Sequence, residues 1–198
     1  MISSLLRQVW PSLRMLVVLT VLLGLAYPLA LTGFAQAAVH GRANGSLIER
    51  DGVTVGSALI GQSFDGEPGY FQSRPSAAGD GYDPLASGAS NLGPGSPVLL
   101  KLVQERRAAA AKLDGTAPAD VPPDALEASG SGLDPQISPA YAAQQVDRVA
   151  RVRGMTPAAV RKLVERYTDG RSLGFLGEPR VDVLELNLAL DRAAGTAH

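Results

Sequence analysis

The five residues Gly170–Gly174 read GRSLG and match the G-x-S-x-G motif, in which the serine of a hydrolase is the nucleophile. Such a serine needs a strand before it, a helix after it and a histidine as its base. Here a helical pattern precedes the motif, and the two histidines, His40 and His198, lie at opposite ends of the chain that follows an N-terminal apolar run. We therefore expect that Ser172 is not a nucleophile and that the chain has no catalytic residue.

The composition excludes other kinds of site. The chain has no cysteine, so it forms neither a disulfide nor a thiolate site. Because its two histidines are far apart in the sequence, we also expect no His-based metal site. A formal net charge of −1 gives no electrostatic basis for binding nucleic acid. The remaining candidates are residues that bind a partner.

The first candidate for binding is the segment Tyr70–Ser76, which reads YFQSRPS. One interpretation is an edge strand whose two aromatic residues, Tyr70 and Phe71, pack on the core before a turn at Pro75. In the other, Arg74 is an oriented surface cation, because an arginine fork pairs well with a partner's carboxylate. The sequence leaves both interpretations open.

Two loops are further candidates. Residues 77–97 are rich in Gly, Ser, Pro and Asp and include the turn-forming sequence SNLGP, Ser90–Pro94. Long irregular loops on compact domains are often binding elements. The loop Ser129–Gly132 reads SGSG. Either its backbone N–H groups bind an anion, or it is a plain turn, which is the commoner case.

One apolar segment determines where these candidates lie. Leu16–Ala35 carries no charge, and about 20 helical residues match a hydrocarbon core roughly 30 Å thick. We predict a transmembrane helix over residues 15–36. The preceding residues contain Arg7 and Arg14 and no acid, so the positive-inside rule places residues 1–14 in the cytoplasm. Residues 37–198 then form a single periplasmic (extracytoplasmic) domain.

A signal peptide is the alternative. Ala35-Gln36-Ala37 is followed by Ala38 and resembles a signal-peptidase site. Cleavage after Ala37 would release a free periplasmic binding or hydrolytic protein. The apolar run is longer than the roughly 7 to 15 residues usual in signal peptides, which favours a retained anchor.

The pattern after the span predicts a mixed α+β domain with a small sheet and about four helices. A hairpin is expected over residues 47–60, with its turn at Asp51-Gly52. Ser-Pro and Thr-Pro pairs mark helix starts, and glycines mark helix ends. The expected helices cover residues 96–113, 138–154, 156–167 and 182–192; Asp182 caps the last, whose apolar side chains predict deep packing.

Beside the single span, the chain contains a series of distinctive blocks in a fixed order: YFQSRPS (Tyr70–Ser76), SNLGP (Ser90–Pro94), ASGSGLDPQISP (Ala128–Pro139), QVDRVARVRG (Gln145–Gly154) and GFLGEPRVDVLELNLALD (Gly174–Asp191). With these features the sequence resembles the C subunit of the bacterial Kdp potassium-transporting ATPase over nearly its whole length. Two residues differ from those that many members carry: Gln136 stands in place of His or Asn, and Asp182 in place of Asn.

This resemblance implies a non-catalytic accessory subunit of an ATP-driven potassium uptake complex in the bacterial inner membrane. The expected partners are a channel-like potassium-conducting subunit, a P-type ATPase subunit, a small membrane subunit and the lipid bilayer. The chain is expected to assist assembly and to modulate ATP affinity or potassium entry. The residues expected to bind these partners are Tyr70, Phe71, Arg74, Pro75, Ser90, Asn91, Gly93 and Pro94.

Potassium and ATP are expected to belong to the complex, and this chain is expected to hold no cofactor. It has neither the D-K-T-G tetrapeptide of a phosphorylated pump nor a P-loop, so ATP chemistry falls mainly to a partner. The family is sometimes described as nucleotide-binding, through a Gln-x-x-Arg pattern that Gln145 and Arg148 match. An extracytoplasmic location, where ATP is scarce, argues against that role.

Overall fold

The computed structural model describes residues 2–193 and 195, with side chains from residue 7 onward. His198, the last residue of the predicted domain 37–198, lies outside the described residues. The chain divides into two compact units, Met1–Leu47 and Ile48–His198.

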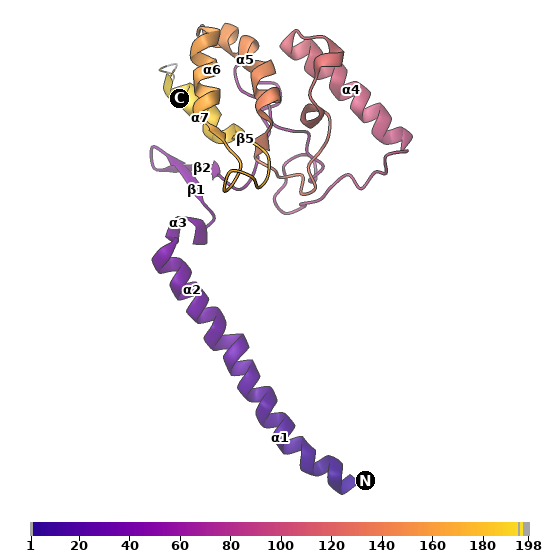
Figure 1. Cartoon of the computed structure of the whole chain (residues 1–198), viewed down its shortest axis with the longest axis vertical. Helices are drawn as coiled ribbons and strands as arrows, with labels where there is room; N and C mark the ends of the chain where they lie inside the picture. Colours follow the sequence, from indigo (N-terminus) through magenta and orange to yellow (C-terminus); the bar gives the residue numbers. More distant parts are fainter. Residues whose placement is uncertain (1, 194, 196–198) are drawn as a thin grey trace. The chain divides into compact units, whose positions relative to one another are not determined.

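The first unit is almost entirely helical (Figure 1). It contains α1 (Ile2–Val21), a π-helical turn η1 (Leu22–Ala26), α2 (Tyr27–Ala38) and the short α3 (His40–Ala43). From Arg7 to Ala38 the helical run spans 32 residues with a mean hydropathy of 2.2, and none of its apolar window is buried. It is thus long and apolar enough to cross a membrane, and it extends beyond the predicted residues 15–36 at both ends.

Pro28 explains the π-helical turn in this run. Proline has no N–H, and its ring crowds the carbonyl four residues earlier. The wider turn η1 ends at Ala26, two residues before Pro28, so the helix continues through the proline without interruption. The effect of Pro28 on this helix is therefore a local widening.

The second unit is a mixed helix-and-sheet fold, as predicted. β1 (Leu47–Arg50) and β2 (Val53–Ser57) form a two-stranded sheet. Asp51 and Gly52 both have positive φ, which is the backbone of a tight hairpin turn. A second, antiparallel sheet has the order β3-β5-β4, built from Gln136–Ile137, Arg180–Asp182 and Thr168–Asp169.

The four predicted helices are all present: α4 (Pro97–Asp114), α5 (Pro139–Arg153), α6 (Pro157–Arg166) and α7 (Val183–Ala193). The 3₁₀ turns η2 (Pro118–Asp120) and η3 (Pro123–Ala125) connect α4 to β3. The side chains of Ser96, Ser138 and Thr156 accept hydrogen bonds from the first turns of α4, α5 and α6. Asp182 accepts from the N–H of Glu185 at 3.0 Å and caps α7 as predicted.

The core lies among α5, α6, α7 and β5, which group together in Figure 1, with α4 to one side. Leu186 and Leu190 of α7 are 0% exposed, which confirms that this helix is deeply packed. Ala142, Val146, Val149 and Ala150 form a buried apolar stripe on α5, and Val160 and Val164 bring α6 into the same cluster.

The prediction of an edge strand at Tyr70–Ser76 is wrong. This segment is extended but has no strand partner among the described residues. Its hydrogen bonds go to side chains of α5 and α7 instead. The motif Gly170–Gly174 lies in the loop between β4 and β5, so the short strand β4, and not the predicted helix, directly precedes it. Among the described residues, β5 is the next element after Ser172, so the strand-to-helix turn of a hydrolase motif is not formed.

Candidate docking site

Two buried amide side chains hold the backbone of Phe71 and Gln72. Asn187, on α7, accepts from the N–H of Phe71 at 2.8 Å and donates to its carbonyl at 3.0 Å. Gln145, on α5, accepts from the N–H of Gln72 at 2.6 Å and donates to its carbonyl at 3.2 Å. Each side-chain amide bonds both the N–H and the carbonyl of one residue, as a residue of a neighbouring strand would. The backbone groups of the segment are thereby satisfied, so it can stay extended without belonging to a sheet.

Arg148 fixes the backbone just before these two residues. Its side chain is 1% exposed, and its Nε donates to Oδ1 of Asp114 at 2.7 Å. Its Nη2 donates to Oε1 of Gln145 at 2.6 Å, and its Nη1 donates to the carbonyls of Pro68 and Tyr70. A buried charge is tolerated only when paired and hydrogen-bonded, and Arg148 meets both conditions. It therefore fastens this segment to α5.

A second ionic cluster holds Tyr70. Asp191 of α7 accepts from Arg50 at 2.9 Å, from Arg153 at 2.7 Å and from the Tyr70 hydroxyl at 3.2 Å. The Arg153 guanidinium lies 4.3 Å from the centre of the Tyr70 ring, and its Nε donates to the Gly69 carbonyl at 2.7 Å. The cluster ties the hairpin, α5 and α7 to one aromatic side chain.

These contacts change how four of the predicted site residues are understood. Gln145 and Arg148 are 0% and 1% exposed and are engaged with the chain itself, so their geometry is that of structural clamps. Nucleotide binding by them stays a prediction. Phe71 is 0% exposed and belongs to the core, so it positions its neighbours. Tyr70 is half-buried.

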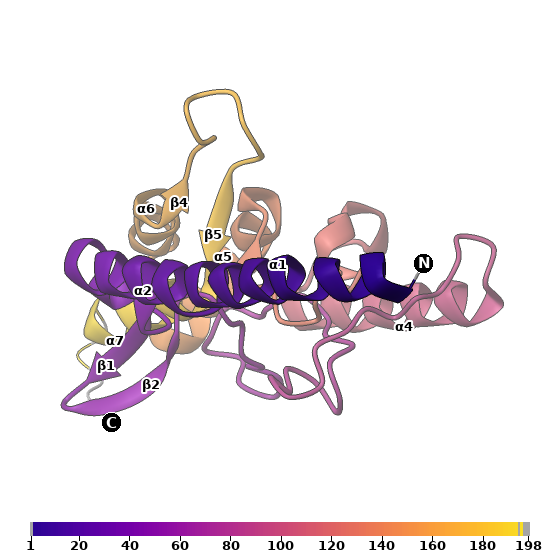
Figure 2. The same ribbon diagram turned by 90° about the horizontal axis from the view of Figure 1, so that it is seen from below.

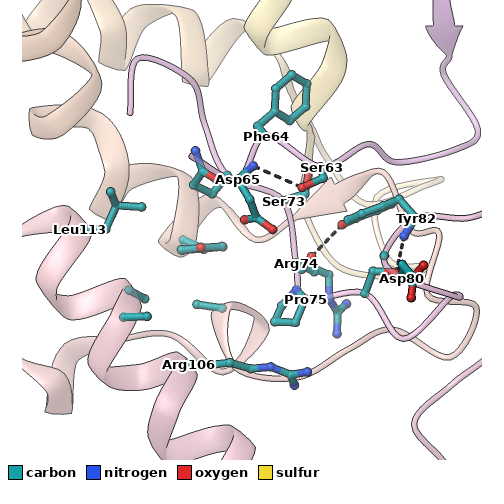
Figure 3. A pocket seen from close by; sticks show the side chains of 17 residues that line it. Ser63, Phe64, Asp65, Ser73, Arg74, Pro75, Asp80, Tyr82, Arg106 and Leu113 are labelled. Carbon is teal, nitrogen blue, oxygen red and sulfur yellow. Dashed lines mark hydrogen bonds between the residues drawn. The ribbon is translucent and has the colours of Figure 1, made fainter. Parts of the chain in front are cut away.

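The second half of the segment forms one wall of an open cleft of about 390 Å³ (Figure 3). Ser73, Arg74 and Pro75 line this wall, and Tyr82 lines it beyond them. The opposite wall comes from α4, through Arg106, Ala109, Ala110 and Leu113. The cleft thus has a small apolar surface on α4 that faces polar and charged groups.

Arg74 is half-buried and paired within the chain. Its side chain is only 24% exposed, and its Nη1 lies 3.3 Å from Oδ2 of Asp134. Its Nη2 donates to the Glu127 carbonyl at 3.3 Å. Its Nε has no hydrogen-bond partner in the part of the chain that the structure describes, but this atom is buried and out of a partner's reach. Nη1 and Nη2 each carry a second N–H besides the one used in these contacts, so the guanidinium keeps unused donors.

Hydrogen bonds restrain Arg74 and Arg106. Asp134 and the Glu127 carbonyl hold the Arg74 guanidinium, and the Tyr82 hydroxyl donates to the Arg74 backbone carbonyl at 2.7 Å. Burial raises the pKa of Tyr82 to about 12. Arg106 donates to the Leu126 carbonyl at 2.8 Å, and burial lowers its pKa from the usual value. The two cations are therefore held in place before any partner arrives.

The SNLGP loop is not part of this cleft. Ser90, Asn91, Gly93 and Pro94 are exposed, and none of them lines it. Asn91 has a φ of +52°, and its side chain donates to the Ala89 carbonyl at 3.2 Å, as in a tight turn. The SNLGP loop therefore contributes nothing to the cleft, and partner binding by its residues stays a prediction.

The SGSG loop is a turn packed against the long irregular stretch. Gly132 has a φ of +68°, and its N–H donates to the Ser129 carbonyl at 3.3 Å. A Cβ at Gly132 would lie 2.7 Å from both the Ala78 nitrogen and the Gly88 oxygen, so only glycine fits. Ser131 accepts from the N–H of Gly88 at 2.8 Å.

No group of three or more His, Asp and Glu side chains suited to a metal ion occurs among the described residues. One apolar N-terminal helix together with a small α+β domain that carries an open cleft is typical of a membrane-associated protein.

The family comparison gives the particular class. Residues 9–192 match the model of the KdpC family, described as the K+-transporting ATPase, c chain. The chain belongs to this family.

Relatives named "Potassium-transporting ATPase KdpC subunit" resemble it over almost their whole length. One from Kineococcus radiotolerans is 61% identical and covers 98% of this chain and 97% of its own. Those from Sorangium cellulosum and Mycobacterium tuberculosis are 55% and 54% identical; they cover 92% and 94% of this chain and 96% and 98% of their own. The alternative of a free binding or hydrolytic protein is not supported.

Proposed function

We propose that this accessory subunit of the K+-transporting ATPase assists assembly and stability of the pump by docking another subunit in the cleft at Arg74. The observation that carries the proposal is the arrangement of the cleft. A restrained cation, whose Nη1 and Nη2 groups keep unused donors, lines the same cleft as an apolar surface on α4. An extended segment with an acidic side chain beside small apolar residues would match both walls.

The proposed orientation places the N-terminus in the cytoplasm and the domain outside it. Arg7 and Arg14 are the charged residues of the described chain before the apolar run, and basic flanks stay on the cytoplasmic side. The span is retained as an anchor. The docking partner is then an extracytoplasmic face of the channel-like or ATPase subunit, with the small membrane subunit alongside the span.

Potassium and ATP stay with the partners in this proposal. Residues 15–36 contain no charged side chain, and ions crossing a membrane need polar partners, so this helix does not line the potassium path. The chain has no D-K-T-G sequence and no P-loop, so it hydrolyses no ATP itself. Any effect on ATP affinity or potassium entry is exerted through docking.

The test blocks the cleft without disturbing the fold. Ala109 is exposed on α4 and lines the cleft, so Ala109→Trp should fill it. Ala108 is the exposed neighbour that does not line it, so Ala108→Trp is the matched control. Potassium uptake and recovery of the complex from membranes should fall about tenfold or more for Ala109→Trp.

Equal uptake and recovery for the two tryptophan variants would contradict docking in the cleft. Two further measurements test the accessory role itself. The purified chain should show no ATP turnover, and a strain without it should take up no potassium through the pump. Turnover by the chain alone, or normal uptake without it, would contradict the proposal.

A further inference from the structure

The loop between β4 and β5 presents an apolar tip that the cleft does not use. In Figure 2 this loop stands clear of the helices and sheet of its unit. Leu173, Phe175 and Leu176 are 83%, 69% and 49% exposed. Three large apolar side chains within four residues are unusual on a water-facing loop, since solvation of such a group is unfavourable.

Backbone hydrogen bonds make this tip rigid. Ser172 and Leu176 exchange two of them, each of 2.9 Å, and so form a bridge across the tip. Below the bridge, Arg171 and Glu178 form an ion pair of 2.7 Å. The apolar side chains are thus displayed on an ordered hairpin, which lowers the entropy lost when the tip binds.

Leu173 adds a second unfavourable feature. Its φ is +54°, in the left-handed region that a bulky L-residue seldom adopts, and Gly174 follows with a φ of +81°. Neither the strained backbone of Leu173 nor the exposure of its side chain stabilises the free domain. Strain of this kind clusters at binding elements, where a partner compensates for it.

The charges around the tip indicate what covers it. Arg171 is paired with Glu178, and Arg180 lies 3.6 Å from Asp169, so these four charges sum to zero. An element that binds anionic lipid headgroups needs an excess of basic residues, which this loop lacks. A neutral apolar tip fits an uncharged apolar pocket on a protein.

We propose that the hairpin Ser172–Leu176 inserts into an apolar pocket on another subunit of the pump, as a docking contact separate from the cleft. This inference rests on the proposed function in one respect, namely that the partner is a pump subunit. It adds a second contact and its chemistry: Leu173 and Phe175 are the anchors.

The experiment uses the full chain in the assembled complex. The double variant Leu173→Asn/Phe175→Ser removes the apolar tip, and asparagine tolerates the left-handed backbone at position 173. The control, Leu59→Ser/Leu85→Ser, changes two residues that are 61% and 95% exposed elsewhere in the same unit. We expect recovery of the complex to fall about tenfold or more for the hairpin variant and to stay unchanged for the control.

A photo-crosslinking residue at position 173 identifies the partner directly. A cross-link to another pump subunit supports the proposal; cross-links only to lipid, or only to a second copy of this chain, overturn it. Equal recovery of the hairpin variant and its control also overturns it, even while Ala109→Trp still blocks docking. If uptake proves independent of the chain, the accessory role fails, whereas the cross-link still reports on the hairpin.

Discussion

Asn187 illustrates how a single side chain takes the place of a neighbouring strand in this molecule. Its amide satisfies both backbone groups of Phe71, and Gln145 does the same for Gln72. A buried N–H or carbonyl without a partner costs about 1–3 kcal/mol. The extended segment that leads to the cleft is therefore held by two amides, beside the ionic contacts of Arg148.

Removing one amide should destabilise the domain. Asn187→Leu keeps a similar volume but leaves the N–H and carbonyl of Phe71 unpaired inside the core. We expect the free energy of unfolding to fall by about 2–5 kcal/mol. Gln104→Leu, on an exposed position of α4, is the control and should change it by less than about 0.5 kcal/mol. Chemical denaturation measures both; a loss below about 1 kcal/mol for Asn187→Leu would mean that other groups replace the amide.

Asp182 gives the domain a pH dependence. Burial raises the pKa of this helix-capping carboxyl from 3.8 to about 6. Because the folded state then binds the proton more tightly than the unfolded chain, stability should fall as pH rises from about 4 to about 6. Asp182→Asn keeps the cap and removes the titration.

The substitution should therefore stabilise the domain at pH 7 by about 1–2 kcal/mol, after allowing for partial solvent screening, and should flatten the slope between pH 4 and 6. Thermal unfolding across this pH range measures the effect. An unchanged slope would show that another group is responsible for it.

At the scale of elements, α7 carries more of the structure than its 11 residues suggest. The apolar side chains of α7 fill the core, and its N-terminus is capped by Asp182 of β5. Asn187 and Asp191 of the same helix bind the segment that contains Tyr70 and Phe71. A change in this helix thus affects the core and the cleft wall together.

Truncating its buried leucines should be costly. Leu186→Ala and Leu190→Ala each remove a side chain that is 0% exposed, so each should lower the free energy of unfolding by about 2–5 kcal/mol. Leu100→Ala, on α4 at 59% exposure, is the matched control and should have little effect. Losses below about 1 kcal/mol for both α7 variants would refute the assignment of this helix to the core.

At the scale of the whole molecule, the orientation of the membrane helix decides on which side of the membrane the folded domain lies. The chain has no cysteine, so single introduced thiols report on topology without background. Glu105→Cys, on the exposed face of α4, should react with an impermeant thiol reagent in intact spheroplasts, and Ser3→Cys should not. The reverse pattern would refute the proposed orientation.

The mass of the purified chain should stay at 20.5 kDa, whereas an N-terminus at Ala38 would indicate cleavage.

The sequence by itself determined the features that depend on neighbouring residues. The apolar helix, the caps at Ser96, Ser138 and Thr156 and the buried stripe of α5 follow from local composition and spacing. Each signal lies within a few residues of the structure that it specifies, so a single sequence is enough to detect it.

Only the tertiary structure decided the site. Phe71 and Asn187 are 116 positions apart, and Arg74 and Asp134 are 60 positions apart, so no local pattern announces either pair. The YFQS sequence has the composition of a strand, but side-chain amides from distant helices pair with the backbone of Phe71 and Gln72. Asp134 pairs with Arg74, which the sequence offered as a surface cation for a partner. Contacts between residues far apart in the sequence depend on how the helices pack, which the folded chain alone establishes.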